Sequence, residues 1–432
     1  MVPKHYRRSC LDCIPDHPLH SDLVTRLKNA LEVGDKDTMM DILCAKVKHV
    51  DATIELSNDD WMKSPTAQLH PLVLVGLWSL EYKRELTNPL CISASHGHTA
   101  CLRHLLFWRA DPNAAPGGQS ALHEACRGGH ADCVELLLEH KANPNLLNDD
   151  GQAPLHLCAS QNSLRCAKTL VTFGALVNQP SEETQETPLH TAAKHGLYEH
   201  ADLYLRNGAM VDMKNSLEET ALSVTCREAK EREKQESYLR VCQLLLTYGA
   251  EVNSEDEEMK TPLHKACKNA HHSLVLLLLQ SQADINALDY NGASPLSCVL
   301  QAAAFKKEMR PHRTVQTLLN HGSPKIWPTA FVKVLKSCSS VPEIIEILCN
   351  SYPHLPISEK WVEAIPKEDF QRYLPFYESL FRQMYTVRTL QHLCRCAIRR
   401  RLGRKCHSLI PLLPAPKSLQ SYLLLEPEGI LL

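Results

Sequence analysis

Near the N-terminus of this 432-residue chain, a short motif has side chains that could bind a metal ion. Cys10-Leu11-Asp12-Cys13 is flanked by His5, His17 and His20. Thiolates and imidazoles are the usual zinc ligands, but a structural zinc site takes two ligand pairs at recognisable spacing. The sequence contains no second Cys-x-x-Cys. We therefore predict no metal site and no bound cofactor.

Histidines that could act as general bases recur along the middle of the chain: His123, His156, His190 and His264. A general base needs a reacting group within hydrogen-bond reach, and no nucleophile accompanies these residues at a constant spacing. The sequence also lacks the G-x-x-x-x-G-K, H-E-x-x-H and G-x-S-x-G patterns of nucleotide hydrolases, zinc proteases and serine hydrolases. We predict that each imidazole hydrogen-bonds to a neighbouring turn. We predict no catalytic residue and no enzymatic activity.

A stripe near the C-terminus has the spacing of a binding surface: Leu390, Leu393, Cys394, Ala397 and Ile398. On a helix these residues share one face. The tail has little other apolar sequence that could cover the stripe, so the stripe is suited to a groove on another protein. The alternative is that it packs against the preceding part of the same chain. Fifteen residues after Ile398, Leu413-Pro414-Ala415-Pro416 predicts an extended segment, because proline restricts φ.

A basic run follows the stripe directly: Arg399, Arg400, Arg401, Arg404 and Lys405. Such a run could be a nuclear import signal or a nucleic-acid patch. The whole chain, however, has 47 basic and 49 acidic residues and a net charge of −2. This balance argues against general binding to nucleic acid or to an anionic membrane. We expect the run to be a solvated helix face.

The composition indicates a reduced intracellular compartment. No apolar run approaches the roughly 18 residues that a membrane helix needs, and MVPKHYRRSC is not followed by the apolar stretch of a secretory signal. The 18 cysteines are spread over the whole chain, mostly within apolar helical patterns, where free cysteine packs as a small hydrophobe. We expect a cytoplasmic protein, with the nucleus as a second location.

A four-residue phrase recurs seven times, starting at Asn88, Ser120, Ala153, Thr187, Thr220, Thr261 and Ser294. The start-to-start spacings are 32, 33, 34, 33, 41 and 33 residues. Thr187-Pro188-Leu189-His190 is typical. A Thr or Ser can cap the first helix, and proline at the first helical position needs no N–H partner. A Cys- or Ala-rich helix, a break and a Leu-rich helix follow each phrase, and one such pair cannot bury its own apolar face.

This phrase and period resemble the ankyrin repeat. The resemblance implies an all-α ankyrin-repeat solenoid of helix pairs with hairpin loops. We expect a helical connector and a C-terminal three-helix box to follow it, the box because the stripe and the Leu-Pro-Ala-Pro segment resemble a SOCS box. The predicted divisions are an N-terminal region with a degenerate capping repeat (1–87), seven ankyrin repeats (88–323), the connector (324–386) and the box (387–432). The connector is predicted from helical spacing at 332–335, 344–348 and 376–381.

Repeats followed by this tail resemble the ankyrin repeat and SOCS box family, from Asn88 to the end of the chain. Locally, "LWSLEYKREL" (77–86), "APGGQSALHEAC" (115–126) and the terminal "YLLLEPEGILL" are most similar to members 4, 10 and 18. The resemblance implies a substrate-recognition subunit of an E3 ubiquitin ligase that leads to ubiquitination and proteasomal degradation of its target. The stripe would bind elongin C, with elongin B, and cullin-5 with a RING-box protein would bind Leu413, Pro414 and Pro416. Ala415 stands where the family often has a larger apolar residue.

Parts of the chain depart from the repeat pattern. Residues 21–50 are predicted to form a degenerate helix pair, while 51–86 fit no repeat and have no predicted structure. In the repeat that begins at Thr220, the first helix is predicted to extend through 227–234, which accounts for the 41-residue spacing. A similar extension is expected at 305–312.

Acidic residues lie at the predicted hairpin tips between repeats, and we hypothesise that they form a substrate-binding ridge: Glu182, Glu183, Glu186, Glu255, Asp256, Glu257 and Glu258. Such a ridge would attract a protein substrate with a basic surface. The alternative is that these are solvated loop residues.

Two further functions compete with that of a ligase receptor. A plain ankyrin scaffold would bind a partner without delivering it for modification, but it would have no use for the stripe and the Leu-Pro-Ala-Pro segment together. A pseudo-receptor would bind elongins yet recruit cullin-5 poorly because of Ala415.

Overall fold

The computed structural model describes residues 15–19, 21–33, 35–47, 49–57, 84–355, 359–383 and 386–429. Cys10, Cys13, His5 and His20 lie outside this part, as does most of 51–86. Two compact units divide the chain: residues 1–191 with 206–209, and residues 192–205 with 210–432. Within the described part, no helix is long and apolar enough to cross a membrane.

The first unit begins with the predicted degenerate helix pair, formed by α1 (Asp22–Val33) and α2 (Lys36–Asp41), the latter continued by the π-helical turn η2 (Ile42–Lys46). A small antiparallel sheet, which the sequence did not predict, follows the pair. It joins β1 (Ile54–Ser57) to β2 (Arg84–Thr87), with Ile54 opposite Thr87 and Ser57 opposite Arg84. The two strands have only four residues each and are far apart in the chain. The alternation of apolar and polar residues within them is therefore too short to indicate a strand.

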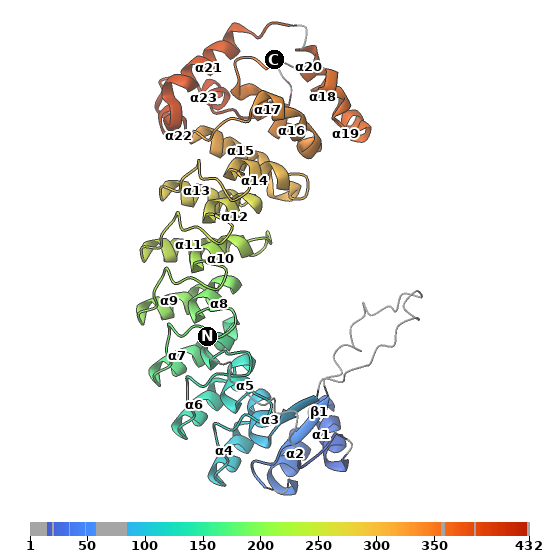
Figure 1. Cartoon of the computed structure of the whole chain (residues 1–432), viewed down its shortest axis with the longest axis vertical. Coiled ribbons are helices and arrows are strands. Elements are labelled where there is room, and N and C mark those ends of the chain that lie inside the picture. The colour runs from blue at the N-terminus through green and yellow to red at the C-terminus, as the bar shows by residue number, and fades with distance from the viewer. Residues whose placement is uncertain are drawn as a thin grey trace, which may run out of the picture. The chain divides into compact units, whose positions relative to one another are not determined.

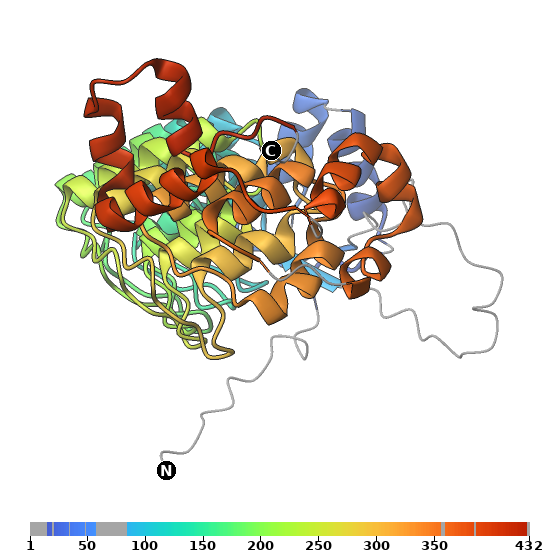
Figure 2. The ribbon, with the colours of Figure 1, turned by 90° about the horizontal axis from the view of Figure 1, so that it is seen from above.

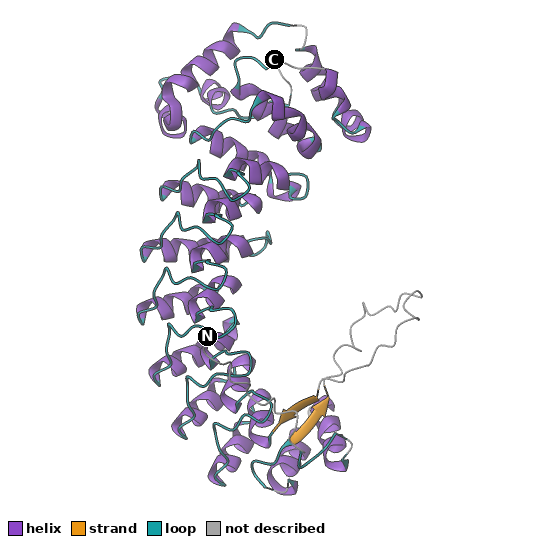
Figure 3. Ribbon diagram, in the orientation of Figure 1, coloured by secondary structure: helices purple, strands orange, loops and turns teal. Residues whose placement is uncertain are grey.

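Helices form at all seven recurring phrases (Figures 1 and 3). In chain order the pairs are α3 (Pro89–Ser95) with α4 (Thr99–Phe107), α5 (Ala121–Gly128) with α6 (Ala131–Glu139), η4 (Pro154–Leu157) with α7 (Leu164–Thr172), α8 (Pro188–His195) with α9 (Tyr198–Arg206), α10 (Ala221–Glu228) with α11 (Gln235–Thr247), α12 (Pro262–Lys268) with α13 (His272–Gln280), and α14 (Pro295–Ala302) with α15 (Pro311–Asn320). The described part of the chain is therefore helical apart from the one sheet, as predicted.

The third pair differs from its neighbours because its first helix is a single 3-10 turn, η4, followed by a second short turn, η5 (Gln161–Ser163). The repeat of α5 ends its first helix at Gly129, which adopts φ +74°. The third repeat has Asn162 at the equivalent place, preceded by Ser160, which favours turns over helix. The backbone N–H of Ser160 instead donates to Ser163 Oγ at 3.2 Å.

The prediction that the helix starting at Ala221 extends through 227–234 is wrong. α10 ends at Glu228, a loop follows, and the inserted residues lengthen the second helix, α11, at its N-terminus. Tyr238 explains why the inserted residues lengthen the second helix and not the first. It lies in the added turn, is 6% exposed, and its hydroxyl donates to Lys194 O at 3.0 Å. The additional turn thus buries an aromatic side chain against the preceding repeat of the second unit.

The predicted connector is helical at all three expected places. It comprises α16 (Phe331–Cys338), α17 (Pro342–Ser351), α18 (Glu359–Glu363), α19 (Lys367–Arg372) and α20 (Leu374–Arg382). The C-terminal box follows as α21 (Leu390–Leu402), α22 (Cys406–Leu409) and α23 (Lys417–Leu423), which confirms three helices. In Figures 1 and 2, α18–α20 and the box helices lie on opposite sides of α17.

Candidate functional site

The stripe on α21 points to solvent. Leu390 is 76% exposed, Leu393 41% and Ile398 39%, and Cys394 and Ala397 are also exposed. Large apolar side chains of a monomer are rarely exposed together on one helix face, and such patches mark interaction sites. The alternative, that the stripe packs against the preceding part of the chain, does not agree with these exposures.

The opposite face of α21 is buried, and it is polar. His392 and Arg395 are 1% and 4% exposed, and Cys396 is buried beside them. His392 Nε2 donates to Tyr352 O of the connector at 2.8 Å, and Arg395 Nη2 donates to His392 Nδ1 at 2.8 Å. The Arg395 guanidinium lies 4.1 Å from the ring centroid of Tyr422 in α23, a cation–π contact. These contacts hold α21 so that its apolar face points outward.

Burial of His392, followed by the nearby charge of Arg388, lowers the pKa of this imidazole to about 4. The neutral ring is the form that can donate through Nε2 and accept through Nδ1 at once. Thr389 caps the helix, because its Oγ1 accepts from His392 N at 3.2 Å. The buried face was missed in the sequence, although 392, 395, 396 and 399 have helical spacing.

Arg399 was expected to belong to a solvated face, and this expectation is wrong. Its Nη1 donates to Asn320 Oδ1 at 2.6 Å and to Leu423 O at 2.8 Å, and its Nη2 donates to Leu319 O at 3.2 Å. The guanidinium therefore joins α21 to α15 and α23. The rest of the basic run, Arg400, Arg401, Arg404 and Lys405, is exposed as expected.

The Leu-Pro-Ala-Pro segment is a loop between η9 (Ile410–Leu412) and α23. Pro414 and Pro416 are exposed, whereas Leu413 is half-buried against the small core of the box, Cys406, Ile410 and Leu423. The side-chain amide of Gln420 donates to Leu413 O at 3.0 Å and to Ala415 O at 3.2 Å. Leu412, which the sequence analysis did not select, is 78% exposed beside the prolines.

The acidic hairpin tips differ in exposure. Glu182, Glu183, Glu255, Glu257 and Glu258 are exposed, and Glu186 is half-buried. In the second unit, neighbouring tips touch through their backbones, since Glu257 N donates to Leu217 O at 3.3 Å and Tyr290 N to Glu258 O at 2.9 Å. Lysines at the tips neutralise part of the charge: Lys214 pairs with Glu218 at 3.1 Å, and Lys260 pairs with Glu258.

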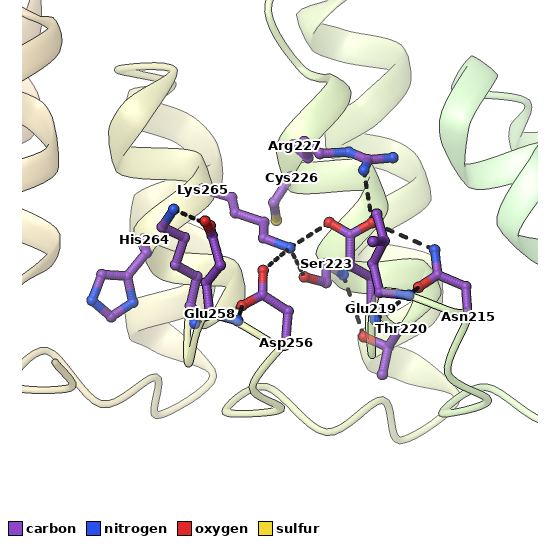
Figure 4. A network of polar contacts seen from close by, with 12 residues as sticks. Asn215, Glu219, Thr220, Ser223, Cys226, Arg227, Asp256, Glu258, His264 and Lys265 are labelled. Carbon is purple, nitrogen blue, oxygen red and sulfur yellow. Dashed lines mark hydrogen bonds and ion pairs between the residues drawn. The ribbon is translucent and has the colours of Figure 1, made fainter. Parts of the chain in front are cut away.

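Asp256 is not a free surface carboxylate. Its side chain is 7% exposed and lies 2.7 Å from the Nζ of Lys265, which is equally buried. Lys265 also contacts Glu219 at 2.5 Å and Ser223 Oγ at 2.8 Å (Figure 4). Glu219 in turn pairs with Arg227 at 2.8 Å. This network ties two hairpin tips to two inner helices, so Asp256 has a structural role.

The recurring histidines have the predicted structural role. Nε2 of His123 donates to Gln152 O at 3.0 Å, and the corresponding contacts run from His156 to Glu186 O at 3.0 Å and from His264 to Ala293 O at 3.1 Å. His190 accepts from Thr187 Oγ1 at 2.9 Å. Burial lowers the pKa of His123 to about 4. The rings of His123, His156 and His264 thus join a helix start to the next hairpin.

Comparison with known proteins places these features in a family. The SOCS box family matches residues 386–424, and ankyrin repeats match 77–147, 140–215 and 231–330. Human ankyrin repeat and SOCS box protein 18 is 54% identical over 461 residues, covering 97% of this chain and 99% of that protein. The human proteins 16 and 10 are 40% and 44% identical, each covering 82% of this chain and 77% of its own length.

Among solved structures, the crystal structure of the human ASB11 ankyrin repeat domain is 27% identical to this chain, with a TM-score of 0.46. It covers 52% of this chain and 97% of that domain. The predicted resemblance to members 10 and 18 agrees with the sequence relatives. A chain with an outward apolar stripe on a SOCS box helix, ankyrin repeats before it and 54% identity to protein 18 belongs to the ankyrin repeat and SOCS box family.

Proposed function

We propose that this protein is the substrate-recognition subunit of an E3 ubiquitin ligase built on elongin B, elongin C, cullin-5 and a RING-box protein. One observation carries the proposal: α21 presents Leu390, Cys394 and Ile398 to solvent while its other face is anchored by buried hydrogen bonds. A preorganised apolar helix face loses little conformational entropy on docking into a groove.

The chain itself would contribute proximity. The SOCS box would be bound to elongin C, and the ankyrin repeats would hold a target protein so that its lysines meet the conjugating enzyme. The exposed Pro414 and Pro416, held by Gln420, support a second contact, with cullin-5. Leu412 adds an exposed apolar side chain there, while the half-buried Leu413 supports the loop from below.

The target surface we propose combines apolar and acidic groups. In the second unit the tips expose Leu217, Met259 and Tyr290, together with the exposed Glu255 and Glu257. A basic segment with apolar side chains would complement them. Replacing Glu255 and Glu257 by lysine should weaken target binding and reduce its salt dependence, and unchanged binding would contradict this surface.

The proposal is tested by an elongin-binding experiment on the full chain. The variant is Leu390→Ala with Ile398→Ala, which removes two exposed apolar side chains. The matched control is Ser408→Ala with Ser418→Ala, two exposed residues on the other two box helices. Burying one leucine contributes about 1.5–3 kcal/mol, so the stripe variant should bind the purified elongin B/C dimer about a hundredfold more weakly. The control should bind like the wild type.

Each result distinguishes the competing functions. Elongin and cullin-5 binding that is lost only in the stripe variant supports the ligase receptor. Elongin binding without cullin-5 would support the pseudo-receptor, in which Ala415 weakens the cullin contact. A wild-type chain that binds neither protein would be an ankyrin scaffold.

A further inference from the structure

A basic cavity lies within the second unit, between the end of the last repeat, the connector and the SOCS box. Its volume is about 260 Å³. Four of its twelve lining residues are cationic, namely Lys325, Arg399, Arg400 and Arg404, and none of the twelve is acidic. The cavity lies off the elongin stripe: none of the five stripe residues lines it.

The cations of the cavity have no acidic partner among the residues that the structure describes. Arg399 uses its guanidinium on an amide oxygen and two backbone carbonyls. Lys325 Nζ donates to Ser351 O. Elsewhere in the described chain, lysines and arginines form ion pairs with carboxylates, as Lys265 does with Glu219. Positive charge thus accumulates here without a protein carboxylate to compensate it.

Grouping cations in a partly buried place is unfavourable, because the charges repel each other and lose water. Lys325 is still exposed to solvent, so these costs act on it in part. Its pKa lies below the ordinary value because of burial first, and the charges of Arg399 and Arg400 contribute. Burial also lowers the pKa of Arg399. An anion bound among these groups would relieve both the repulsion and the lost hydration.

The backbone brings Arg404 close to the last repeat. Gly322, at the end of α15, has φ +88°, and a Cβ there would lie 2.5 Å from Arg404 Cγ and 3.0 Å from Arg404 Cα. Only glycine fits this approach without displacing the box helix. The absence of a side chain at 322 thus lets the Arg404 end of the box reach the wall of the cavity.

We propose that this cavity binds a small soluble anion with phosphate groups, of about the size of pyrophosphate. Arginine and lysine are the side chains suited to phosphate, because they offer several charged N–H donors to its oxygens. The volume is below the 300–1,000 Å³ typical of sites for drug-sized ligands, so a compact, highly charged anion fits it best. Because the lining comes from the last repeat, the connector and the box, the bound anion would brace the box against the repeats. This inference does not depend on the ligase function.

Calorimetric titration of the full chain with pyrophosphate tests the site, with sodium chloride added to constant ionic strength. The variant is Arg400→Glu with Arg404→Glu, since both side chains are exposed and form no hydrogen bond or ion pair within the part of the chain that the structure describes. The control is Arg401→Glu with Lys405→Glu, the same charge change on neighbouring exposed residues that do not line the cavity. We expect saturable binding by the wild type, at least tenfold weaker binding by the cavity variant, and near-wild-type binding by the control.

The melting temperature and circular dichroism test whether weaker pyrophosphate binding by the cavity variant reflects loss of the site and not unfolding. Pyrophosphate should raise the melting temperature of the wild type and of the control but not of the cavity variant, and circular dichroism should show that both variants are folded. Three results would overturn the proposal. These are no saturable binding above that of chloride, an equal loss in the control, and binding of a phosphoserine peptide but not of pyrophosphate. The last would assign the cavity to a phosphorylated protein.

Discussion

Arg399 of the SOCS box donates a 2.6 Å hydrogen bond from Nη1 to Asn320 Oδ1 of the last ankyrin helix. Asn320 in turn donates from Nδ2 to Leu424 O at 3.0 Å, and Arg399 also reaches Leu423 O. The box is therefore connected to the repeats by a closed set of buried polar contacts, and not by apolar packing alone.

Arg399→Ala should destabilise the C-terminal part of the protein by about 3 kcal/mol, because it leaves buried oxygens without a donor and hydrogen bonds to charged groups contribute about 1.5–3 kcal/mol each. Urea unfolding together with amide exchange in α23 would measure this loss. The exposed Arg401, replaced by Ala, is the control and should change stability by less than about 0.5 kcal/mol. Equal effects of the two substitutions would show that the Arg399 contacts contribute nothing.

Lys265 should be more important for stability than the surface lysines. Lys265→Ala leaves the buried carboxylate of Asp256 without its ion-pair partner and removes one of the two cations that pair with Glu219, the other being Arg227. Breaking a buried pair in this way costs about 3–5 kcal/mol. Lys214→Ala removes an exposed pair with Glu218 and should cost about 0–1 kcal/mol. Urea unfolding of both variants checks the difference. A Lys265 variant as stable as the Lys214 variant would contradict the structural role of the network in Figure 4.

The repeats could be predicted from the sequence because their signals are local and recur. A capping Thr or Ser, a proline at the first helical position and a leucine after it favour a helix start, and variants of this phrase recur seven times. The stripe on α21 could be predicted for the same reason, since residues at i, i+4 and i+8 share a face whatever surrounds the helix.

Features that depend on distant partners could not be predicted. Arg399 has the sequence context of a solvated basic run, but Asn320, about 80 residues earlier, accepts its hydrogen bond. Asp256 has the context of an exposed loop, but Lys265 and its neighbours enclose it. The extra turn of α11 follows from the burial of Tyr238 against Lys194, because tertiary contacts outweigh the helical propensity of a charged segment.

His392 should make the stability of the SOCS box depend on pH. The unfolded chain takes up a proton at this side chain near pH 6.5, whereas the folded protein holds it neutral to about pH 4. Between these values the unfolded chain binds more protons, so the free energy of unfolding falls as the pH falls. The contribution of His392 is complete above about pH 6.5, is reduced by on the order of 1–2 kcal/mol at pH 5, and is lost as the pH falls through about 4.

The measurement is urea unfolding at several pH values, followed by tryptophan fluorescence. Trp361, which is buried against Phe331, contributes to this signal from the connector that the SOCS box contacts. His392→Gln keeps an N–H donor for Tyr352 O but does not titrate. Other buried histidines also contribute, so the readout is the difference between the two curves. We expect the wild type to lose more stability than the variant between pH 7 and pH 5. Parallel curves would mean that His392 is protonated to the same extent in both states.

Gln420 should control cullin-5 binding without affecting elongin binding. Its amide holds the carbonyls of Leu413 and Ala415, and this fixes the loop that presents Pro414 and Pro416. Gln420→Ala frees the loop, so docking must then order it, at a cost of about 1–2 kcal/mol per residue fixed. We expect the elongin-bound protein to bind cullin-5 about tenfold more weakly. Surface-immobilised complexes with elongin B/C would measure both affinities.

Ser418→Ala is the matched control, because Ser418 is an exposed residue of the same helix, α23. It should leave both affinities unchanged. If Gln420→Ala weakened elongin binding as much as cullin-5 binding, the substitution would be unfolding the box rather than freeing the loop. If it changed neither, the Leu-Pro-Ala-Pro segment would not be the cullin contact, and the exposed prolines would have to serve another partner or none. If Gln420→Ala weakened cullin-5 binding alone, the cullin would recognise the conformation of this loop, because the substitution leaves the residues of the Leu-Pro-Ala-Pro segment unchanged.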